Sequence, residues 1–199
     1  MLSFALAVLL LVITPGPGVL SLAGVGSAFG RAAGWRYLWG LFLGNNLVSL
    51  AVVSGLAALV LAHDGLRVLL LAASTAYLLY LAARIAFAGA QIAFITRSDP
   101  PGLRGGLALQ VINPKAYAVG TALFSGFGFM PEAPLWEVAI KFVLLNAVWL
   151  PVHAGWLQAG LTLRRLSLPP RTQRIINIVM ALALLTVVAL AVLFALRAA

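Results

Sequence analysis

The sequence lacks cysteine and has very little charge. Its 199 residues include no Cys and only four Asp and Glu together, and 9% of them are charged, against about 25% in an ordinary soluble domain. The lack of cysteine excludes disulfides, thiol chemistry and zinc–thiolate sites. So few charges cannot cover the surface of a soluble fold of this length, and the composition therefore excludes a soluble globular enzyme.

Apolar residues dominate instead, at 63% of the chain. A spanning helix needs roughly 20 apolar residues, so the length allows about six spans and little else. We predict an all-α membrane protein with six transmembrane helices in a single domain, residues 1–199. The predicted spans are about Leu2–Phe29, Trp35–Ala62, Leu66–Phe87, Gly106–Phe129, Leu135–Leu157 and Ile175–Leu196, with a tight turn at His63-Asp64-Gly65. No Lys or Arg precedes the first run, which we interpret as a retained span rather than a signal peptide.

The net charge of +9 forms no basic face that would indicate a nucleic-acid partner. The Lys and Arg residues stand between the apolar runs, where membrane proteins carry topology signals. The first, third and fifth connections and the adjoining helix ends hold Arg31, Arg36, Arg84, Arg97, Arg104, Arg164, Arg165, Arg171 and Arg174. The opposite side holds Arg67, Lys141 and Arg197 together with Asp64, Glu132 and Glu137. Because cytoplasmic loops are enriched in Lys and Arg, we predict that both termini lie outside the cytoplasm.

Two spans contain a break, and the breaks indicate an internal repeat. The first span is interrupted by Thr14-Pro15-Gly16-Pro17-Gly18, and the fourth by Asn113-Pro114-Lys115. Asn46 follows Pro15 by 31 residues, and Asn146 follows Pro114 by 32. A repeated three-span unit must be inverted relative to its partner, and broken helices in inverted repeats mark the substrate site of many secondary transporters. We therefore predict two inverted three-helix repeats, at about 1–95 and 104–199, in which the first and fourth helices are broken.

Lys115 is the strongest candidate for a functional residue. It lies about nine residues into the fourth span, hence near mid-membrane, where a lysine costs at least a few kcal/mol. Asn is a good helix N-cap and Pro suits the first helical position, so Asn113-Pro114 predicts a second half-helix with Lys115 in its first turn. A cation is disfavoured at a helix N-terminus unless an anion binds there, so this pattern predicts a carboxylate site. The alternative is a lysine that lines a wet crevice and has only a structural role.

The break in the first span supplies further candidate substrate-binding residues, which are Thr14, Pro15, Gly16 and Pro17. The prolines remove backbone donors and interrupt the helix, and glycine allows a ligand to approach the backbone closely. The alternative is a kink that only shapes packing, since proline is common in membrane helices.

Three amides and one histidine complete the candidate site. Asn45, Asn46 and Asn146 can hydrogen-bond a zwitterion, but they can equally hold helices together. His153 lies two turns after Asn146 on nearly the same helix face and is a candidate proton carrier. A neutral histidine that is hydrogen-bonded to a neighbouring helix is the alternative.

Several kinds of catalytic or cofactor site are missing from the sequence. No predicted span has an Asp or Glu near its middle, and no Gly-Lys-Ser/Thr phosphate loop occurs. No His, Asp and Glu residues have metal-ligand spacing. We therefore expect no enzymatic activity, no cofactor and no metal.

The order and spacing of these motifs resemble the LysE/RhtB family, the lysine and threonine–homoserine exporters of bacteria. The resemblance is carried by Thr14-Pro15-Gly16-Pro17-Gly18, Gly30-Arg31-Ala32-Ala33-Gly34, Gly40, Gly44, Ala76-Tyr77-Leu78, Gly106, Asn113-Pro114-Lys115 and Ala122-Leu123-Phe124. Gly40 and Gly44 also form a small-xxx-small pair, which favours close helix packing. The resemblance covers nearly the whole chain and implies a bacterial inner-membrane protein that exports amino acids or related small metabolites with the proton gradient, typically as a homodimer.

The chain departs from the family pattern at several positions. The family often has Asp where this chain has Asn146, and Tyr where it has His153. Ser125 replaces a usual proline, and Ala181 and Val188 stand in place of glycines. Without the acidic residue the chain lacks the obvious counter-ion for a substrate amino group, so basic amino acids are poor candidate substrates.

Together these features predict an exporter of small amino-acid-like metabolites that works by alternating access. Lys115 and the half-helix ends would hold the carboxylate, and the three asparagines would bind the polar remainder. The expected partners are a small-molecule substrate and the lipid bilayer. The alternatives are a non-transporting scaffold or assembly factor and a passive channel.

The charge distribution leads to a test of topology. Reporter fusions at Ala199 and near Arg104 should report opposite sides of the membrane, with Ala199 on the periplasmic side, because the arginine-rich connections favour the cytoplasm. One reporter active only in the cytoplasm and one active only in the periplasm measure this at each site. Signals from the same side at both sites would contradict the six-span arrangement.

Overall fold

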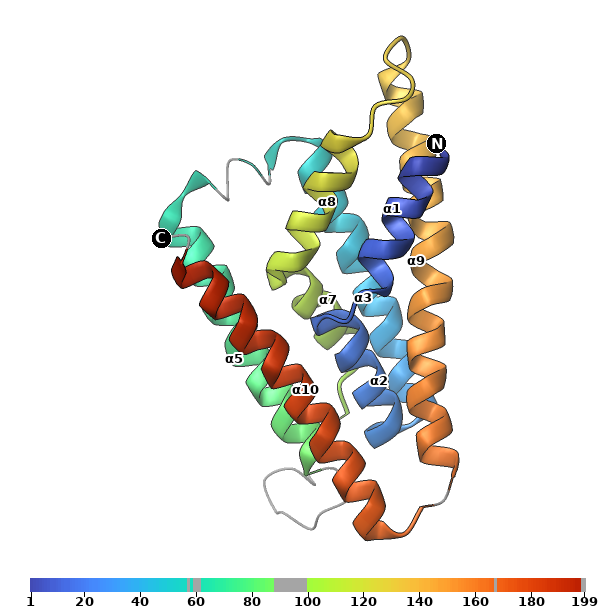
Figure 1. The fold of residues 1–199 in the computed structure, drawn as a ribbon, viewed down its shortest axis with the longest axis vertical. Helices are drawn as coiled ribbons and strands as arrows, with labels where there is room; N and C mark the ends of the chain where they lie inside the picture. The colour runs from blue at the N-terminus through green and yellow to red at the C-terminus, as the bar shows by residue number, and fades with distance from the viewer. Residues whose placement is uncertain (57, 59–61, 88–99, 167, 198–199) are drawn as a thin grey trace.

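The computed structural model describes residues 1–56, 58, 62–87, 100–166 and 168–197, and within these ranges it contains eight helices and no strand (Figure 1). The helices are α1 (Leu2–Ile13), α2 (Pro17–Phe29), α3 (Arg31–Val53), α5 (Asp64–Ala86), α7 (Leu103–Ile112), α8 (Pro114–Gly126), α9 (Pro134–Arg165) and α10 (Pro170–Arg197). The prediction of an all-helical chain is confirmed for these ranges. Helices α1 and α2 flank the break predicted in the first span, and α7 and α8 flank the break predicted in the fourth.

Two of the described helices are long and apolar enough to cross a bilayer, namely Val68–Ala86 within α5 and Pro134–Arg165, which is α9. The pair α1–α2 bends by 53° at its break and adds a third span if the pair is taken as one. By this criterion the described helices account for up to three of the six predicted spans.

The helices form an elongated bundle. Figure 1 shows α1, α2, α3, α7, α8 and α9 gathered together, while α5 and α10 lie side by side and slant away from them toward the upper end. The connections α2–α3 and α9–α10 lie at the lower end, and the connection α8–α9 lies at the upper end. The core includes large buried side chains from several of these helices, namely Phe4, Leu22, Tyr37, Leu109 and Leu157.

Glycines of α3 allow this helix to pack closely on α7. A Cβ atom at Gly40 would overlap with the carbonyl oxygen of Leu103. A Cβ atom at Gly44 would lie 2.6 Å from the Cβ of Gln110. The two backbones therefore approach each other closely, as small-xxx-small pairs permit in membranes, and the predicted packing role of Gly40 and Gly44 is confirmed.

The connection between α3 and α5 differs from the sequence prediction. Helix α3 ends at Val53, and the turn that follows contains Gly55, whose φ of +77° suits glycine. The predicted tight turn at His63-Asp64-Gly65 is right only at its first residue: the chain bends at His63, the N-cap of α5, but Asp64 and Gly65 already belong to that helix. An acidic residue is favoured in the first turn of a helix, and the prediction overlooked this signal.

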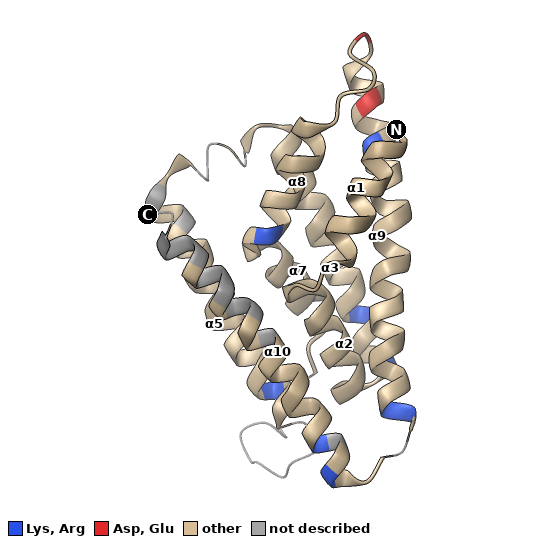
Figure 2. Ribbon diagram, in the orientation of Figure 1, with Lys and Arg blue, Asp and Glu red and all other residues tan. Residues whose placement is uncertain are grey.

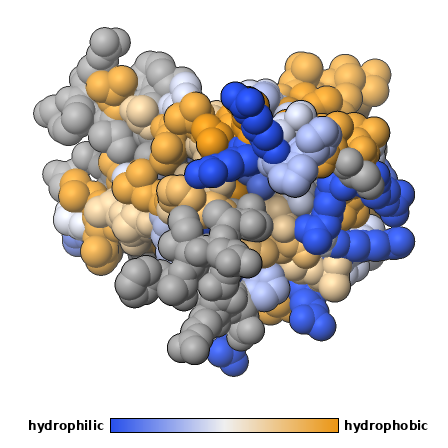
Figure 3. All heavy atoms as spheres, turned by 90° about the horizontal axis from the view of Figure 1, so that it is seen from below, coloured by the Kyte–Doolittle hydropathy of each residue, from blue (hydrophilic) through white to orange (hydrophobic). Residues whose placement is uncertain are grey.

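Charged residues are distributed unevenly along the bundle (Figure 2). Arginines gather at the lower end, around the α2–α3 and α9–α10 connections, whereas Glu132 and Glu137 lie at the upper end, before and at the start of α9. The two lysines, Lys115 on α8 and Lys141 on α9, lie above this lower group. Figure 3 shows the lower end from below, with hydrophilic side chains standing out from a largely apolar surface. Arg97 and the side chains of Arg67 and Arg197 lie outside the described residues.

Candidate functional site

The break between α1 and α2 comprises residues 14–16. Proline lacks an N–H and clashes with the preceding turn, so α1 ends at Ile13. The hydroxyl group of Thr14 donates to the carbonyl oxygen of Leu10 at 2.6 Å, which satisfies a carbonyl near the end of α1. Pro17 is the first residue of α2, a position where the missing N–H would have had no helical partner. The chain therefore changes direction by 53° between two regular helices.

The break between α7 and α8 lies at Asn113, which ends one helix and caps the next. Its Oδ1 accepts a hydrogen bond from the backbone N–H of Lys115 at 3.1 Å, and Pro114 is the first residue of α8. The helix start predicted from this sequence is confirmed. The hydroxyl group of Tyr117 donates to the carbonyl oxygen of Val111 at 2.8 Å and so satisfies a backbone group near the break.

The side chain of Lys115 connects the two breaks. Its Nζ donates to the carbonyl oxygen of Thr14 at 2.8 Å, and a Cβ atom on Gly16 would lie 2.9 Å from its Cδ. Gly16 is the N-cap of α2, and Lys115 stands in the first turn of α8. The positive ends of two half-helices and a lysine ammonium group therefore meet, which favours an anion between them.

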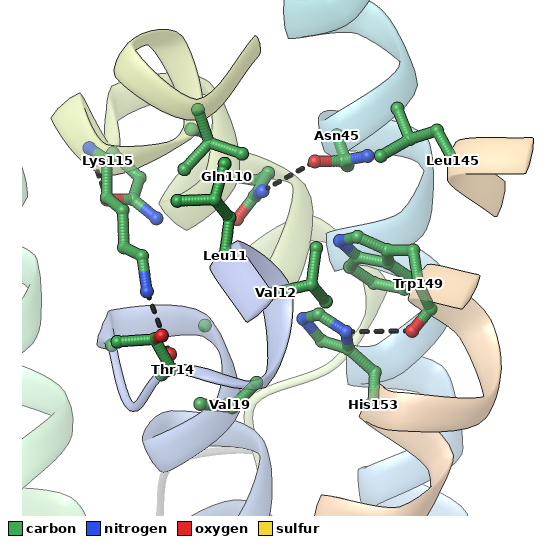
Figure 4. A pocket seen from close by; sticks show the side chains of 15 residues that line it. Leu11, Val12, Thr14, Val19, Asn45, Gln110, Lys115, Leu145, Trp149 and His153 are labelled. Atoms are coloured by element: carbon green, nitrogen blue, oxygen red, sulfur yellow. Dashed lines mark hydrogen bonds between the residues drawn. The ribbon is translucent and has the colours of Figure 1, made fainter. Parts of the chain in front are cut away.

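A cavity lies between the breaks and the middle of α3 and α9 (Figure 4). It is lined by Leu11, Val12, Thr14, Gly16, Gly18, Val19, Asn45, Gln110, Asn113, Lys115, Ala116, Val119, Leu145, Trp149 and His153. The volume open to water centres is about 50 Å³, whereas one ordered water needs roughly 10–15 Å³. The cavity therefore has room for several waters or for a small polar molecule in their place.

Asn45 and Gln110 form the side of the cavity between α3 and α7. Gln110 Nε2 donates to Asn45 Oδ1 at 3.1 Å, and both side chains are buried. Asn45 Nδ2 has no hydrogen-bond partner among the described residues, although only 9% of Asn45 is exposed. A buried donor without a partner costs about 1–3 kcal/mol, so an acceptor on a molecule in the cavity would stabilise this arrangement.

His153 stacks on Trp149, one turn earlier in α9, with the ring centroids 3.4 Å apart and 13° between the ring planes. Its Nδ1 lies 2.9 Å from the carbonyl oxygen of Trp149. Because a carbonyl oxygen can only accept, Nδ1 carries a proton, and Nε2 of the neutral ring is an acceptor. Figure 4 shows the other ring nitrogen turned away from this carbonyl and into the cavity.

The structure brings together part of the predicted site. The predicted residues that line the cavity are Thr14, Gly16, Asn45, Asn113, Lys115 and His153. The prolines at 15, 17 and 114 shape the two breaks and are not part of the lining.

Asn46 and Asn146 bind each other and do not line the cavity. Asn46 Nδ2 donates to Asn146 Oδ1 at 3.0 Å, and Asn146 Nδ2 donates to Asn46 Oδ1 at 2.8 Å. Asn46 Nδ2 also donates to the carbonyl oxygen of Phe42 at 2.9 Å. The pair joins α3 to α9, which is the helix-joining alternative that the sequence left open for these amides.

Gln110 and Trp149 line the cavity, and neither is among the residues predicted from the sequence. Gln110 is an amide in the apolar helix α7, close before the break at Asn113, and that position was an available signal. Trp149 lies in the middle of α9, away from the membrane-interface positions where tryptophan usually anchors a helix.

The cavity offers no metal-binding chemistry in the part of the chain that the structure describes. No group of three or more His, Cys, Asp and Glu side chains that could hold a metal occurs there. The lining contains no Asp or Glu, and its one basic side chain of the Lys or Arg type is Lys115. The arrangement is suited to binding a small molecule through hydrogen bonds and through the ammonium group of Lys115.

The family model described as LysE type translocator matches residues 9–196. The match includes both helix breaks and every residue that lines the cavity. No match was found among the curated proteins or among the solved structures.

The paired asparagines lead to a prediction about stability. Asn46→Leu and Asn146→Leu should each lower the thermal stability of the purified protein, because each leaves one amide without its partner. The double variant should lose less than the two single losses together, with a coupling energy of about 1 kcal/mol. Thermal unfolding of the four proteins in the same detergent measures this energy. A coupling energy of zero would contradict the pairing.

Proposed function

The chain belongs to the family of LysE type translocators, and on this premise we propose that it exports small neutral amino acids or related small carboxylates through the cavity between the two helix breaks. The position of Lys115 carries this proposal, since it lies in the first turn of α8 and reaches the carbonyl oxygen of Thr14 at the other break. A cation at this place is favourable when an anion binds between the helix ends.

Several donors of the cavity lining suit a carboxylate. Lys115 Nζ supplies a charge, and Asn45 Nδ2 lacks a partner among the described residues. The first hydrogen bond inside α2 has Leu20 N–H as its donor, so the N–H groups of Gly18 and Val19 have no acceptor within the helix. Half-helix N-termini of this kind bind substrate carboxylates in broken-helix transporters.

The same cavity argues against basic amino acids as substrates. No acidic side chain of the described residues lines it, and Lys115 already places a positive charge there. A second positive charge on the substrate would have no counter-charge in a poorly solvated interior. Leu11, Val12 and Leu145 supply apolar lining, which suits an uncharged substrate side chain.

The proposal includes six spans in two inverted repeats. The contact between Asn46 and Asn146 supports it, because equivalent residues of two repeats meet only near the axis that relates them. The direction of the broken helices supports it as well. In Figure 1 the chain runs downward through α1 and α2 and upward through α7 and α8.

We place the lower end of the molecule in the cytoplasm and the protein in a bacterial inner membrane. The gathering of arginines at the lower end supports this orientation (Figure 2), because cytoplasmic loops carry an excess of Lys and Arg. Both termini would then lie on the periplasmic side.

Alternating access requires contacts that can close each end of the cavity, and polar contacts occur at both ends. At the upper end Glu137 forms an ion pair of 2.8 Å with Lys141 and accepts hydrogen bonds from backbone N–H groups of the α8–α9 connection. At the lower end the guanidinium group of Arg164 donates to the carbonyl oxygen of Ala28 at 2.7 Å, at the end of α2. The upper contacts link the α8–α9 connection to α9, and the lower contact links the end of α2 to α9.

Coupling to the proton gradient is assigned to His153 in this proposal. Histidine exchanges a proton near neutral pH, and one nitrogen of this ring faces the cavity. Within the described lining, Lys115 is the only other ionisable side chain. A proton carrier beside the substrate site is what an exporter driven by the proton gradient needs.

Lys115→Met tests the carboxylate site. The substitution keeps a long unbranched side chain but removes the charge, and hydrogen bonds to charged groups contribute about 1.5–3 kcal/mol. Affinity for transported amino acids should therefore fall by roughly 10–100-fold. Transport of radiolabelled alanine and valine in proteoliposomes, together with the amount of folded protein in the membrane, measures the effect.

Arg36→Met is the control, because Arg36 is an exposed cation on α3 that lies outside the cavity lining. This variant should keep the parent's KM. Normal export by the Lys115→Met variant would contradict the carboxylate site, and loss of its folded protein would favour a structural role for Lys115.

A further inference from the structure

We propose that Gln110 and His153 form a subsite that holds one positive charge at a time, either the ammonium group of the transported amino acid or a proton on His153 Nε2. This inference rests on the proposed function of the cavity and adds the place where substrate and proton replace each other. No acidic side chain takes part in it.

Two hydrogen-bond acceptors face the same point beside Gly18. A Cβ atom added to Gly18 would lie 3.6 Å from Gln110 Oε1 and 3.7 Å from His153 Nε2. Both side chains are 5% exposed, and within the described part of the chain no group donates to either of these two atoms. Buried acceptors normally have donors, so this point is suited to a group that donates hydrogen bonds.

Neighbouring contacts determine which atoms face this point. Asn45 Oδ1 accepts from Gln110 Nε2, so Oε1 is the end of the amide that is left for the cavity. Trp149 holds the imidazole plane by stacking, and its carbonyl oxygen accepts from Nδ1. The neutral ring therefore presents an acceptor at Nε2, and the protonated ring presents an N–H at the same place.

The cavity offers a cationic donor at the helix breaks and two acceptors beside Gly18. Lys115 Nζ donates beside Thr14, whereas Gln110 Oε1 and His153 Nε2 accept. An α-amino acid carries a carboxylate and an ammonium group on one carbon atom, and these two groups are complementary to the donor and to the acceptors. The ligand class that fits is therefore a zwitterion rather than a simple carboxylate.

The charges around His153 explain why only one positive charge fits. Lys115 on α8 is charged, and α2 directs its positive N-terminus toward the cavity, while α1 and α7 add no charged side chain to the described lining. On α3, Tyr37 is hydrogen-bonded to Ser21 and does not line the cavity, and on α9 Lys141 is ion-paired outside it. With no carboxylate to offset these charges, an ammonium group and a protonated His153 exclude each other.

This exclusion accounts for exchange of substrate for proton. When the amino acid leaves, His153 Nε2 accepts a proton from the side to which the substrate was released. When that proton is lost to the opposite side, Nε2 becomes an acceptor again and binds the next ammonium group. One proton moves in for each zwitterion that moves out, so the inward proton gradient drives export.

Binding of two amino acids and two analogues by the purified protein tests the subsite. Alanine and valine carry the ammonium group, and propionate and isovalerate are the same skeletons without it. The amino acids should bind at least tenfold more tightly than the analogues, because each analogue leaves both acceptors without a donor. As the pH falls, affinity for the amino acids should drop by up to roughly tenfold per pH unit, as expected for competition with one proton, whereas affinity for the analogues should not.

Variants of the subsite separate the roles of its two side chains. His153→Gln supplies an acceptor that does not titrate, so amino-acid exchange should remain detectable in proteoliposomes and lose its pH dependence. Gln110→Leu should weaken the binding of alanine and valine by roughly tenfold or more, and it should weaken the binding of the analogues less.

Gly18→Ala places a methyl group at the ammonium position at ordinary contact distances, so the protein should fold and bind amino acids weakly. Gly155→Ala is the control, because a Cβ atom there meets nothing within 4 Å.

Two results would overturn the subsite while the cavity remained the transport site. One is equal affinity of the parent protein for valine and isovalerate, and the other is pH dependence that persists in the His153→Gln variant. If the parent bound none of the four compounds, both the subsite and the proposed function would be overturned.

Discussion

The hydrogen bond between Lys115 Nζ and the carbonyl oxygen of Thr14 connects the two places where helices of this protein are broken. A broken helix frees backbone groups, and the interior of a bilayer has no water to bind them, so other protein groups must do so. The side chains of Thr14, Asn113 and Tyr117 bind backbone groups near the breaks. The two breaks can therefore persist side by side, and the cavity is the space between them.

Polar groups with and without partners distinguish the supporting structure from the site. Asn46 and Asn146 satisfy each other and join α3 to α9, so they belong to the support. Asn45 and His153 line the cavity, and neither Asn45 Nδ2 nor His153 Nε2 receives a hydrogen-bond partner from the described residues. Polar groups in a protein interior normally have partners, so a cavity lined by such groups is suited to a ligand that supplies them.

The sequence could predict features that depend on neighbouring residues. The start of α8 at Asn113-Pro114 and the end of α1 near Thr14 follow from capping and from proline chemistry. The membrane class follows from composition, and close packing of α3 follows from Gly40 and Gly44.

The sequence could not distinguish the roles of adjacent amides. Asn45 and Asn46 point about 100° apart on the helix, and only the packing of α3 decides which one faces the cavity. Gly44 helps to set that packing through its contact with Gln110, which brings the amide of Gln110 to Asn45. Gln110 itself forms no motif, so its place in the site depends on a contact between helices far apart in the sequence.

Reaction of a single thiol in the cavity tests most directly whether the cavity is the transport site. The chain has no cysteine, so Ala116→Cys would place one reactive group in the lining, and Gly65→Cys would place one on the exposed start of α5 as the control. The measurement is the rate at which a small maleimide labels each variant in proteoliposomes, with and without an amino acid that the same variant transports. We predict that the transported amino acid slows labelling of the Ala116→Cys variant several-fold and leaves the Gly65→Cys variant unchanged. An unchanged labelling rate in an Ala116→Cys variant that still transports the amino acid would contradict the assignment of this cavity.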